Sequence, residues 1–142
     1  MAKTNPKERF DVIDATAAPG NKTTFLGDLL RDRGTVFAFD RDAKRFQILS
    51  QRCEAFGSGN IECIHGNFLE TDPSSPKFQN VKCILVDPSC SGSGMTHTSL
   101  DITPPSRQRI QSLTKFQLQC IEHAAKFPSV RRISYSTWLP RH

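Results

Sequence analysis

The fold of this chain is decided by the stretch Asp14-Ala15-Thr16-Ala17-Ala18-Pro19-Gly20-Asn21-Lys22-Thr23. An apolar segment over residues 10–13 leads into it, and a segment with the spacing of an amphipathic helix follows it. Small residues and a glycine between a strand and a helix let backbone N–H groups approach a bound ligand closely. The stretch is therefore typical of a cofactor-binding loop at the start of an α/β sheet.

Strand-like and helix-like segments alternate on both sides of this loop. We expect strands over residues 10–15, 35–39, 61–65, 81–86 and 131–136, and helices over residues 22–32, 42–56 and 106–127. In the first helix, Phe25, Leu26, Leu29 and Leu30 are expected on the buried face, and Gly34 is a plausible stop. Residues 66–69, 71–76 and 88–105 are expected as loops. The alternation predicts right-handed crossovers and a parallel sheet.

Length and composition are those of one soluble domain with a mildly basic surface. The 142 residues have 37% hydrophobic content, mean hydropathy -0.44, net charge +5 and pI about 9.1. We expect a polar lead-in over residues 1–10, a folded unit over 11–138 and a tail over 139–142. No apolar run approaches the ~20 residues that span a bilayer, and no signal peptide is evident. The charge is compatible with RNA, although many enzymes share it.

The cysteine pattern gives no indication of a metal site. The five cysteines form no Cys-x-x-Cys pair and their number is odd, so neither a zinc site nor a disulfide framework is indicated. A reduced intracellular compartment fits this pattern best.

An acidic residue, Asp40, follows the second expected strand and lies 20 positions after Gly20. That spacing suits a carboxylate that accepts hydrogen bonds from a ribose. Alternatively, Asp40 caps the helix that follows it. The loop lacks the glycines of a Walker A or a dinucleotide-binding motif. The remaining candidate ligand is an adenosyl compound without a pyrophosphate, of which S-adenosylmethionine is the common case.

A second loop that carries side chains suited to catalysis follows the fourth expected strand. Its sequence is Asp87-Pro88-Ser89-Cys90-Ser91-Gly92-Ser93-Gly94. It places a carboxylate and a thiol three residues apart at a strand end, where catalytic groups belong in this class of fold. Cys90 is therefore either a reactive group or an ordinary turn cysteine.

Together, the stretches 14–23 and 86–94 resemble the Nol/Nop/Sun family of RNA cytosine-5 methyltransferases. The order Pro88-Ser89-Cys90 is similar to the eukaryotic subfamily that acts on large-subunit ribosomal RNA. The resemblance covers nearly all of residues 11–137. It implies a Rossmann-like methyltransferase fold with about five parallel strands and flanking helices, the last strands of the family being missing. It also implies a nuclear or nucleolar location and RNA as partner.

The resemblance further implies a set of residues that bind S-adenosylmethionine. Asp40 would hold the ribose, and Asn67 takes the place of an acid that contacts the adenine. Arg45 and Asp87 would line the same site. The residues expected around the methionine part are Thr16, Ala17, Ala18, Pro19, Gly20, Asn21 and Lys22.

The family chemistry is methyl transfer to carbon 5 of cytosine after a thiolate has added to carbon 6. Asp87 would stabilise the pyrimidine, and Cys90 would assist release of the product. Trp138 occupies the position where the family has its nucleophilic cysteine, and the chain ends four residues later. The sequence is therefore interpreted as a fragment of the catalytic core. Two alternatives remain, an inactive remnant that binds cofactor or RNA, and direct attack by Cys90.

Overall fold

The computed structural model of the protein describes residues 8–88 and 106–136. All five expected strands and all three expected helices are confirmed, with ends that shift by a few residues. The strands are β1 (Asp11–Asp14), β2 (Val36–Asp40), β3 (Ile61–His65), β4 (Val81–Val86) and β5 (Arg132–Tyr135), and the helices are α1 (Asn21–Leu30), α2 (Ala43–Phe56) and α3 (Arg107–Ala124). Short 3₁₀ turns cover Arg31–Arg33, Phe68–Glu70 and Pro76–Phe78.

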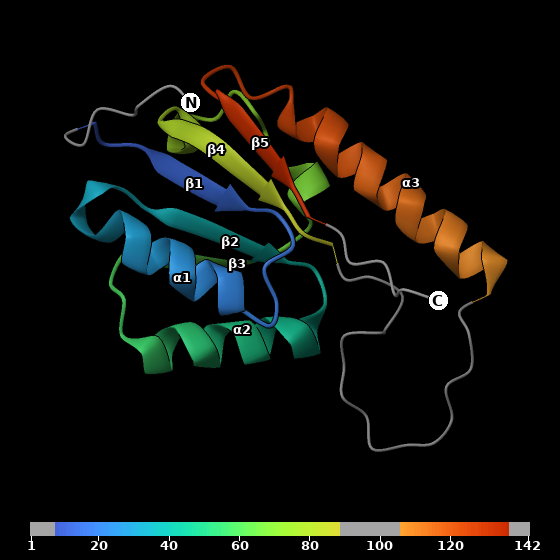
Figure 1. Cartoon of the computed structure of the whole chain (residues 1–142), viewed down its shortest axis with the longest axis horizontal. Helices are drawn as coiled ribbons and strands as arrows, with labels where there is room; N and C mark the ends of the chain where they lie inside the picture. Colours follow the sequence, from blue (N-terminus) through green and yellow to red (C-terminus); the bar gives the residue numbers. More distant parts are fainter. Residues whose placement is uncertain (1–7, 89–105, 137–142) are drawn as a thin grey trace.

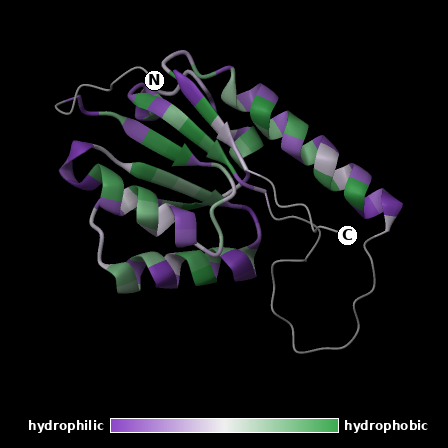
Figure 2. Ribbon diagram, viewed as in Figure 1, coloured by the Kyte–Doolittle hydropathy of each residue, from purple (hydrophilic) through white to green (hydrophobic). Residues whose placement is uncertain are grey.

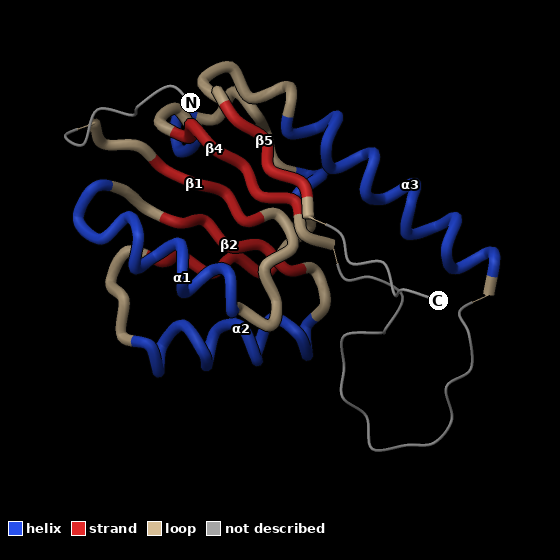
Figure 3. The backbone as a smooth tube through the Cα atoms, viewed as in Figure 1, coloured by secondary structure: helices blue, strands red, loops and turns tan. Residues whose placement is uncertain are grey.

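The strands form one parallel sheet in the order β3-β2-β1-β4-β5 (Figures 1 and 3). The order grows outward from β1 through β2 to β3, and then reverses so that β4 lies on the other side of β1. In an open parallel sheet, ligands bind beyond the carboxyl ends of the strands at such a switch point. β1, β2 and β4 end at this edge, so the residues that directly follow them lie there.

The helices cover both faces of the sheet. Helices α1 and α2 lie over one face, and α3 lies over the other (Figure 1). Hydrophobic residues concentrate on the strands, whereas hydrophobic and hydrophilic residues alternate along the helices (Figure 2). The sheet therefore has a buried layer on each side, as expected for strands that read as nearly continuous apolar runs.

The predicted buried face of the first helix is wrong in two positions. Phe25 is 62% exposed and Leu29 is 51% exposed. The helix instead buries Thr23, Gly27 and Leu30 against the sheet. A Cβ at Gly27 would lie 2.8 Å from Cδ1 of Ile61, so the small residue lets α1 approach β3 closely. The side chains of Phe25 and Leu29 consequently face outward.

Gly34 follows the 3₁₀ turn Arg31–Arg33 that continues α1, so the helical segment ends at this glycine as expected, although the α-helix itself ends earlier. The α-helical hydrogen bonds end at Leu30, where Arg31 adopts a positive φ of 50°. Gly34 itself is extended, with φ 170°. A glycine is required at this position for steric reasons, because a Cβ there would overlap the carbonyl oxygen of Phe10. The glycine therefore also permits the close approach of two backbone segments at the end of this helical segment.

The segment expected as a loop at residues 66–69 contains a core residue. Phe68 begins a 3₁₀ turn and is only 1% exposed. Its ring stacks on Phe127 at 5.7 Å between centroids and meets the ring edges of Phe39 at 5.9 Å and His123 at 5.0 Å. This aromatic cluster packs β2, the 3₁₀ turn and the end of α3 against one another.

Candidate functional site

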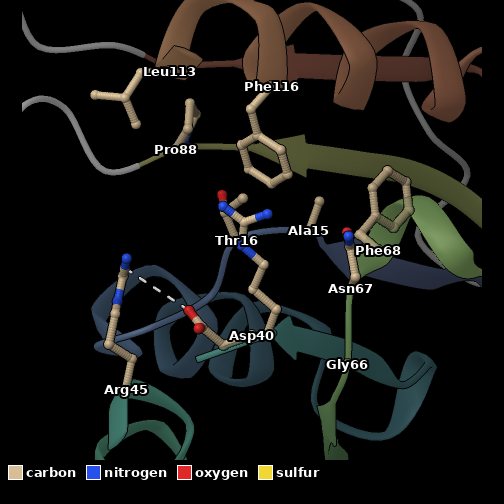
Figure 4. Close-up of a pocket in the computed structure, with 11 residues that line it drawn as sticks. Ala15, Thr16, Asp40, Arg45, Gly66, Asn67, Phe68, Pro88, Leu113 and Phe116 are labelled. Carbon is tan, nitrogen blue, oxygen red and sulfur yellow. Dashed lines mark ion pairs between the residues drawn. The ribbon is translucent and has the colours of Figure 1, made fainter. Parts of the chain in front are cut away.

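A pocket opens at the carboxyl edge of the sheet, between the strand ends and α3 (Figure 4). It is lined by Ala15, Thr16, Asp40, Arg41, Arg45, Gly66, Asn67, Phe68, Pro88, Leu113 and Phe116. Four of the predicted site residues, Thr16, Asp40, Arg45 and Asn67, thus meet in one place. The other predicted residues of the described part lie in the adjoining loop, in the first turn of α1 or at the end of β4.

Asp40 connects the end of β2 to the loop after β1. Its Oδ2 accepts a hydrogen bond from the backbone N–H of Ala18 at 3.3 Å, and its Oδ1 accepts one from the N–H of Asp42 at 3.0 Å. The interpretation of Asp40 as a helix cap is wrong. Asp42 is the cap of α2, because its side chain accepts from the N–H of Arg45 at 2.9 Å. Asp40 therefore does not cap α2, and its carboxylate instead holds the loop after β1 through the backbone of Ala18.

Arg45 strengthens the same connection from the first turn of α2. Its Nη2 donates to the carbonyl oxygen of Ala18 at 3.0 Å and lies 3.8 Å from Oδ2 of Asp40 (Figure 4). Both backbone polar groups of Ala18 are thus bonded to side chains, one at the end of β2 and one in the first turn of α2. The loop is fixed before any ligand arrives, which lowers the entropy that binding must overcome.

Gly20 closes the loop and opens α1. Its backbone is left-handed, with φ 108° and ψ 8°, and no side chain caps the helix that follows. A Cβ at this position would lie 3.1 Å from Cδ1 of Leu49 and 3.4 Å from Cδ of Arg52. The first N–H groups of α1 therefore point toward the loop without a side-chain acceptor, as at helix termini that bind anions.

Replacing Gly20 by alanine is expected to destabilise the protein by more than the ~1–2 kcal/mol that a left-handed conformation costs an L-residue, because the new Cβ is also crowded. Gly57→Ala is the matched control. Gly57 is also left-handed, at φ 73°, but a Cβ there meets nothing within 4 Å. Chemical denaturation of both variants measures the difference. Equal losses for the two would show that the packing of α2 against the loop is not tight.

Lys22 joins the loop after β1 to the ends of β4 and β5. Its Nζ lies 2.5 Å from Oδ2 of Asp87 and donates to Oγ of Ser136 at 3.3 Å. The backbone N–H of Asp87 donates to Oγ1 of Thr16 at 3.1 Å. Asp87 is therefore held from two sides, by a backbone contact and by an ion pair, next to the pocket. Such positioning is what a carboxylate needs to act on a bound group with fixed geometry.

Asn67 lines the pocket from the loop after β3. Its Oδ1 accepts a hydrogen bond from the N–H of Leu69 at 3.0 Å and so caps the 3₁₀ turn that begins at Phe68. The amide is thereby oriented by its own backbone, and an amide nitrogen remains a donor that a carboxylate at this position would lack.

Asp14 is a buried carboxyl beside the pocket-lining residue Ala15, and no role was predicted for it. It is 1% exposed, and its Oδ2 accepts a hydrogen bond from Oγ1 of Thr23 at 2.8 Å. Its Oδ1 has no hydrogen-bond partner among residues 8–88 and 106–136. Burial raises the pKa of this carboxyl from 3.8 to about 6, with Asp87 adding to the effect. The available signal was its position, because it ends β1 as Asp40 ends β2.

Two further pocket residues come from α3, a helix that was not among the predicted site elements. Phe116 points from the helix into the pocket, and Leu113 lies one turn before it (Figure 4). Nothing in the sequence indicated this position, because apolar residues that recur along a helix ordinarily pack on the core.

Cys90 and Trp138 lie outside the described residues. Of the described cysteines, Cys53 and Cys120 are buried, and burial raises their pKa to about 12 and about 11. Such thiols are inert at neutral pH. Within the described part of the chain, no group of His, Cys, Asp and Glu side chains is arranged to hold a metal ion. No helix in that part is both long enough and apolar enough to cross a bilayer.

Comparison with known proteins places these features in a family. Residues 1–137 match the family described as 16S rRNA methyltransferase RsmB/F. A 28S rRNA (cytosine-C(5))-methyltransferase of Mus musculus is 43% identical over 94% of this chain, and the 25S rRNA (cytosine-C(5))-methyltransferase rcm1 of Schizosaccharomyces pombe is 42% identical over 89%. The chain spans 29% of the length of each.

A solved structure shows the same fold. The crystal structure of NSun6 from Pyrococcus horikoshii with SFG, an analogue of S-adenosylmethionine, superposes with a TM-score of 0.61 and 26% identity. The match covers 92% of this chain and 33% of that one. The expected Rossmann-like methyltransferase fold is therefore confirmed.

Proposed function

This chain belongs to the 16S rRNA methyltransferase RsmB/F family, and from that premise we propose that residues 11–138 form the cofactor-binding core for methylation of carbon 5 of cytosine in RNA. The observation that carries the proposal is the convergence of three strand-end features at one switch point. Asp40 holds the backbone of the loop at Ala18, and Lys22 connects that loop to Asp87. Cofactor and acceptor sites would thus be built on the same rigid edge.

The proposed cofactor is S-adenosylmethionine, which supplies the methyl group. The uncapped first turn of α1 and the loop of residues 16–22 suit the carboxylate of its methionine part. The Asp40 carboxylate, whose two internal donors leave lone pairs unused, would accept from the ribose hydroxyl groups. Asn67 would meet the adenine edge, and Arg45 and Asp87 complete the surrounding wall.

The proposed substrate is ribosomal RNA. The relatives named above act on 25S or 28S rRNA, and the net charge of +5 favours a polyanionic partner. A nucleolar location follows as part of this proposal. Asp87, held by Lys22 and by Thr16, would bind the polar edge of the target cytosine, and Cys90 would assist release of the methylated base.

A second candidate function is cofactor or RNA binding without turnover. It is favoured by Trp138, because an indole cannot add to carbon 6 of cytosine as a thiolate does. In that case the site would retain its affinity for S-adenosylmethionine and transfer no methyl group.

One experiment separates these possibilities. S-adenosylmethionine is titrated calorimetrically, and methyl transfer to ribosomal RNA transcripts is then assayed with the wild type, Trp138→Cys and Cys90→Ala. Binding without transfer that is restored by Trp138→Cys supports the non-catalytic candidate. Wild-type transfer that is abolished by Cys90→Ala supports direct attack by Cys90. Absence of binding by the wild type would overturn the assignment of the loop at residues 16–22.

A further inference from the structure

We propose that Arg41 and Phe116 form a stacked wall that recognises the purine base of the cofactor, so that α3 contributes a specificity-determining residue to the site. The inference rests on the proposed function and extends it to two residues that no motif indicated. Cζ of Arg41 lies 4.5 Å from the centroid of the Phe116 ring. This is a cation–π distance between a residue at the end of β2 and a residue of α3.

Both members of the pair face the pocket. Phe116 is half-buried and projects from α3 into it (Figure 4). Arg41 directly follows Asp40 in the chain and lines the same space. The backbone of Arg41 is held in turn, because its carbonyl oxygen lies 3.2 Å from Nε2 of His65 at the end of β3. The guanidinium is therefore presented from a fixed backbone position.

The chemistry of the lining separates into two ends. Phe116, Leu113 and Pro88 form an apolar side, whereas Asp40 and Asn67 supply polar atoms on the other side (Figure 4). A flat heterocycle joined to a ribose matches this division. The ribose would bind at Asp40, and the attached base would reach the residue that follows Asp40 in the chain. Planar rings stack favourably on aromatic side chains and on guanidinium groups.

Core packing alone does not account for the pair. α3 is anchored mainly by Cys120, His123 and Ala124, which are buried, while residues 106–112 are exposed. Phe116 only borders the main core cluster. Among the described residues, no carboxylate lies within ion-pair distance of Arg41. An arginine whose charge is directed at an aromatic ring beside an open pocket is well placed to contact a ligand.

The test measures the Kd of S-adenosylhomocysteine and the thermal stability for the same variants of the full chain. Phe116→Leu and Arg41→Gln are each expected to raise the Kd about tenfold, the lower range of base–aromatic stacking. Phe116→Tyr keeps the ring and is expected to keep the affinity. The double variant is expected to lose less than the product of the single losses, because the two side chains act as one surface. Leu118→Ala, on the exposed side of α3, and Lys115→Gln are controls that should leave the Kd unchanged.

A lowered melting temperature with an unchanged Kd for Phe116→Leu would overturn the inference, because Phe116 would then be a packing residue only. Equal losses for Phe116→Tyr and Phe116→Leu would overturn it as well, since the ring would not be the feature recognised. If the wild type does not bind S-adenosylhomocysteine, the proposed function itself fails. If the wild type binds and the variants bind equally well, only the wall is refuted.

Discussion

Replacing Phe68 by alanine is expected to lower the free energy of unfolding by about 3–5 kcal/mol, the range for a fully buried phenylalanine. The ring is 1% exposed and contacts three other aromatic rings, those of Phe39, His123 and Phe127. Its removal leaves a cavity between β2 and α3 that this rigid cluster cannot fill. Since small domains have only about 5–15 kcal/mol of stability, much of the total would be lost.

Phe25→Ala is the matched control for this prediction, because it makes the same chemical change on the surface of α1. Phe25 is 62% exposed, so its replacement is expected to change the stability by no more than about 0.5 kcal/mol. Guanidinium chloride unfolding followed by circular dichroism measures both variants. Similar losses for Phe25→Ala and Phe68→Ala would contradict the packing described here.

Asp14→Asn is expected to stabilise the protein above pH 6 by about 3 kcal/mol, since the pKa of Asp14 rises from 3.8 to about 6 and each unit corresponds to ~1.4 kcal/mol. The cause is burial, which penalises the charged carboxylate. The asparagine is neutral at every pH, has the same shape, and its side-chain carbonyl can accept the hydrogen bond from Thr23.

The pH dependence has a definite sign. Between pH 3.8 and about 6 the native protein keeps a proton on Asp14 that the unfolded chain has released. The wild type therefore loses stability as the pH rises through this window, and the loss is constant above it. Below pH 4 the wild type and Asp14→Asn should be nearly equal. Denaturation from pH 4 to pH 8 tests this, and a constant difference between the two proteins would refute the raised pKa.

Asp42→Asn is the control with the opposite slope. The pKa of Asp42 is lowered because its carboxylate accepts the backbone N–H of Arg45 at the start of α2. The stability contributed by this charge is present at neutral pH and is lost as the pH falls below the ordinary value of 3.8. Asp42→Asn should thus lower the stability at neutral pH, and its difference from the wild type should vanish in acid, whereas the difference made by Asp14→Asn grows as the pH rises from 4 to 6.

The candidate site was predicted from the sequence wherever a residue occupies a strand end. The loop at residues 16–22, Asp40 and Asp87 each follow an apolar strand, and parallel strands bring their carboxyl ends to one edge. Asp14 obeys the same rule, yet the sequence of a buried strand carries no local sign that one oxygen of its carboxyl group lacks a partner. Arg41 and Phe116 were missed for another reason, since their contact joins residues 75 positions apart.

The alternation of strands and helices, the class of fold and the strand ends that carry the candidate site are predictable from the sequence alone. These follow from periodicity and turn chemistry, which act over short stretches of chain. The three-dimensional structure was needed to establish which side of α1 is buried, that Phe68 belongs to the core, that Asp42 rather than Asp40 caps α2, and that burial raises the pKa of Asp14. Each of these depends on how closely segments distant in the chain approach one another, and local patterns do not encode that distance.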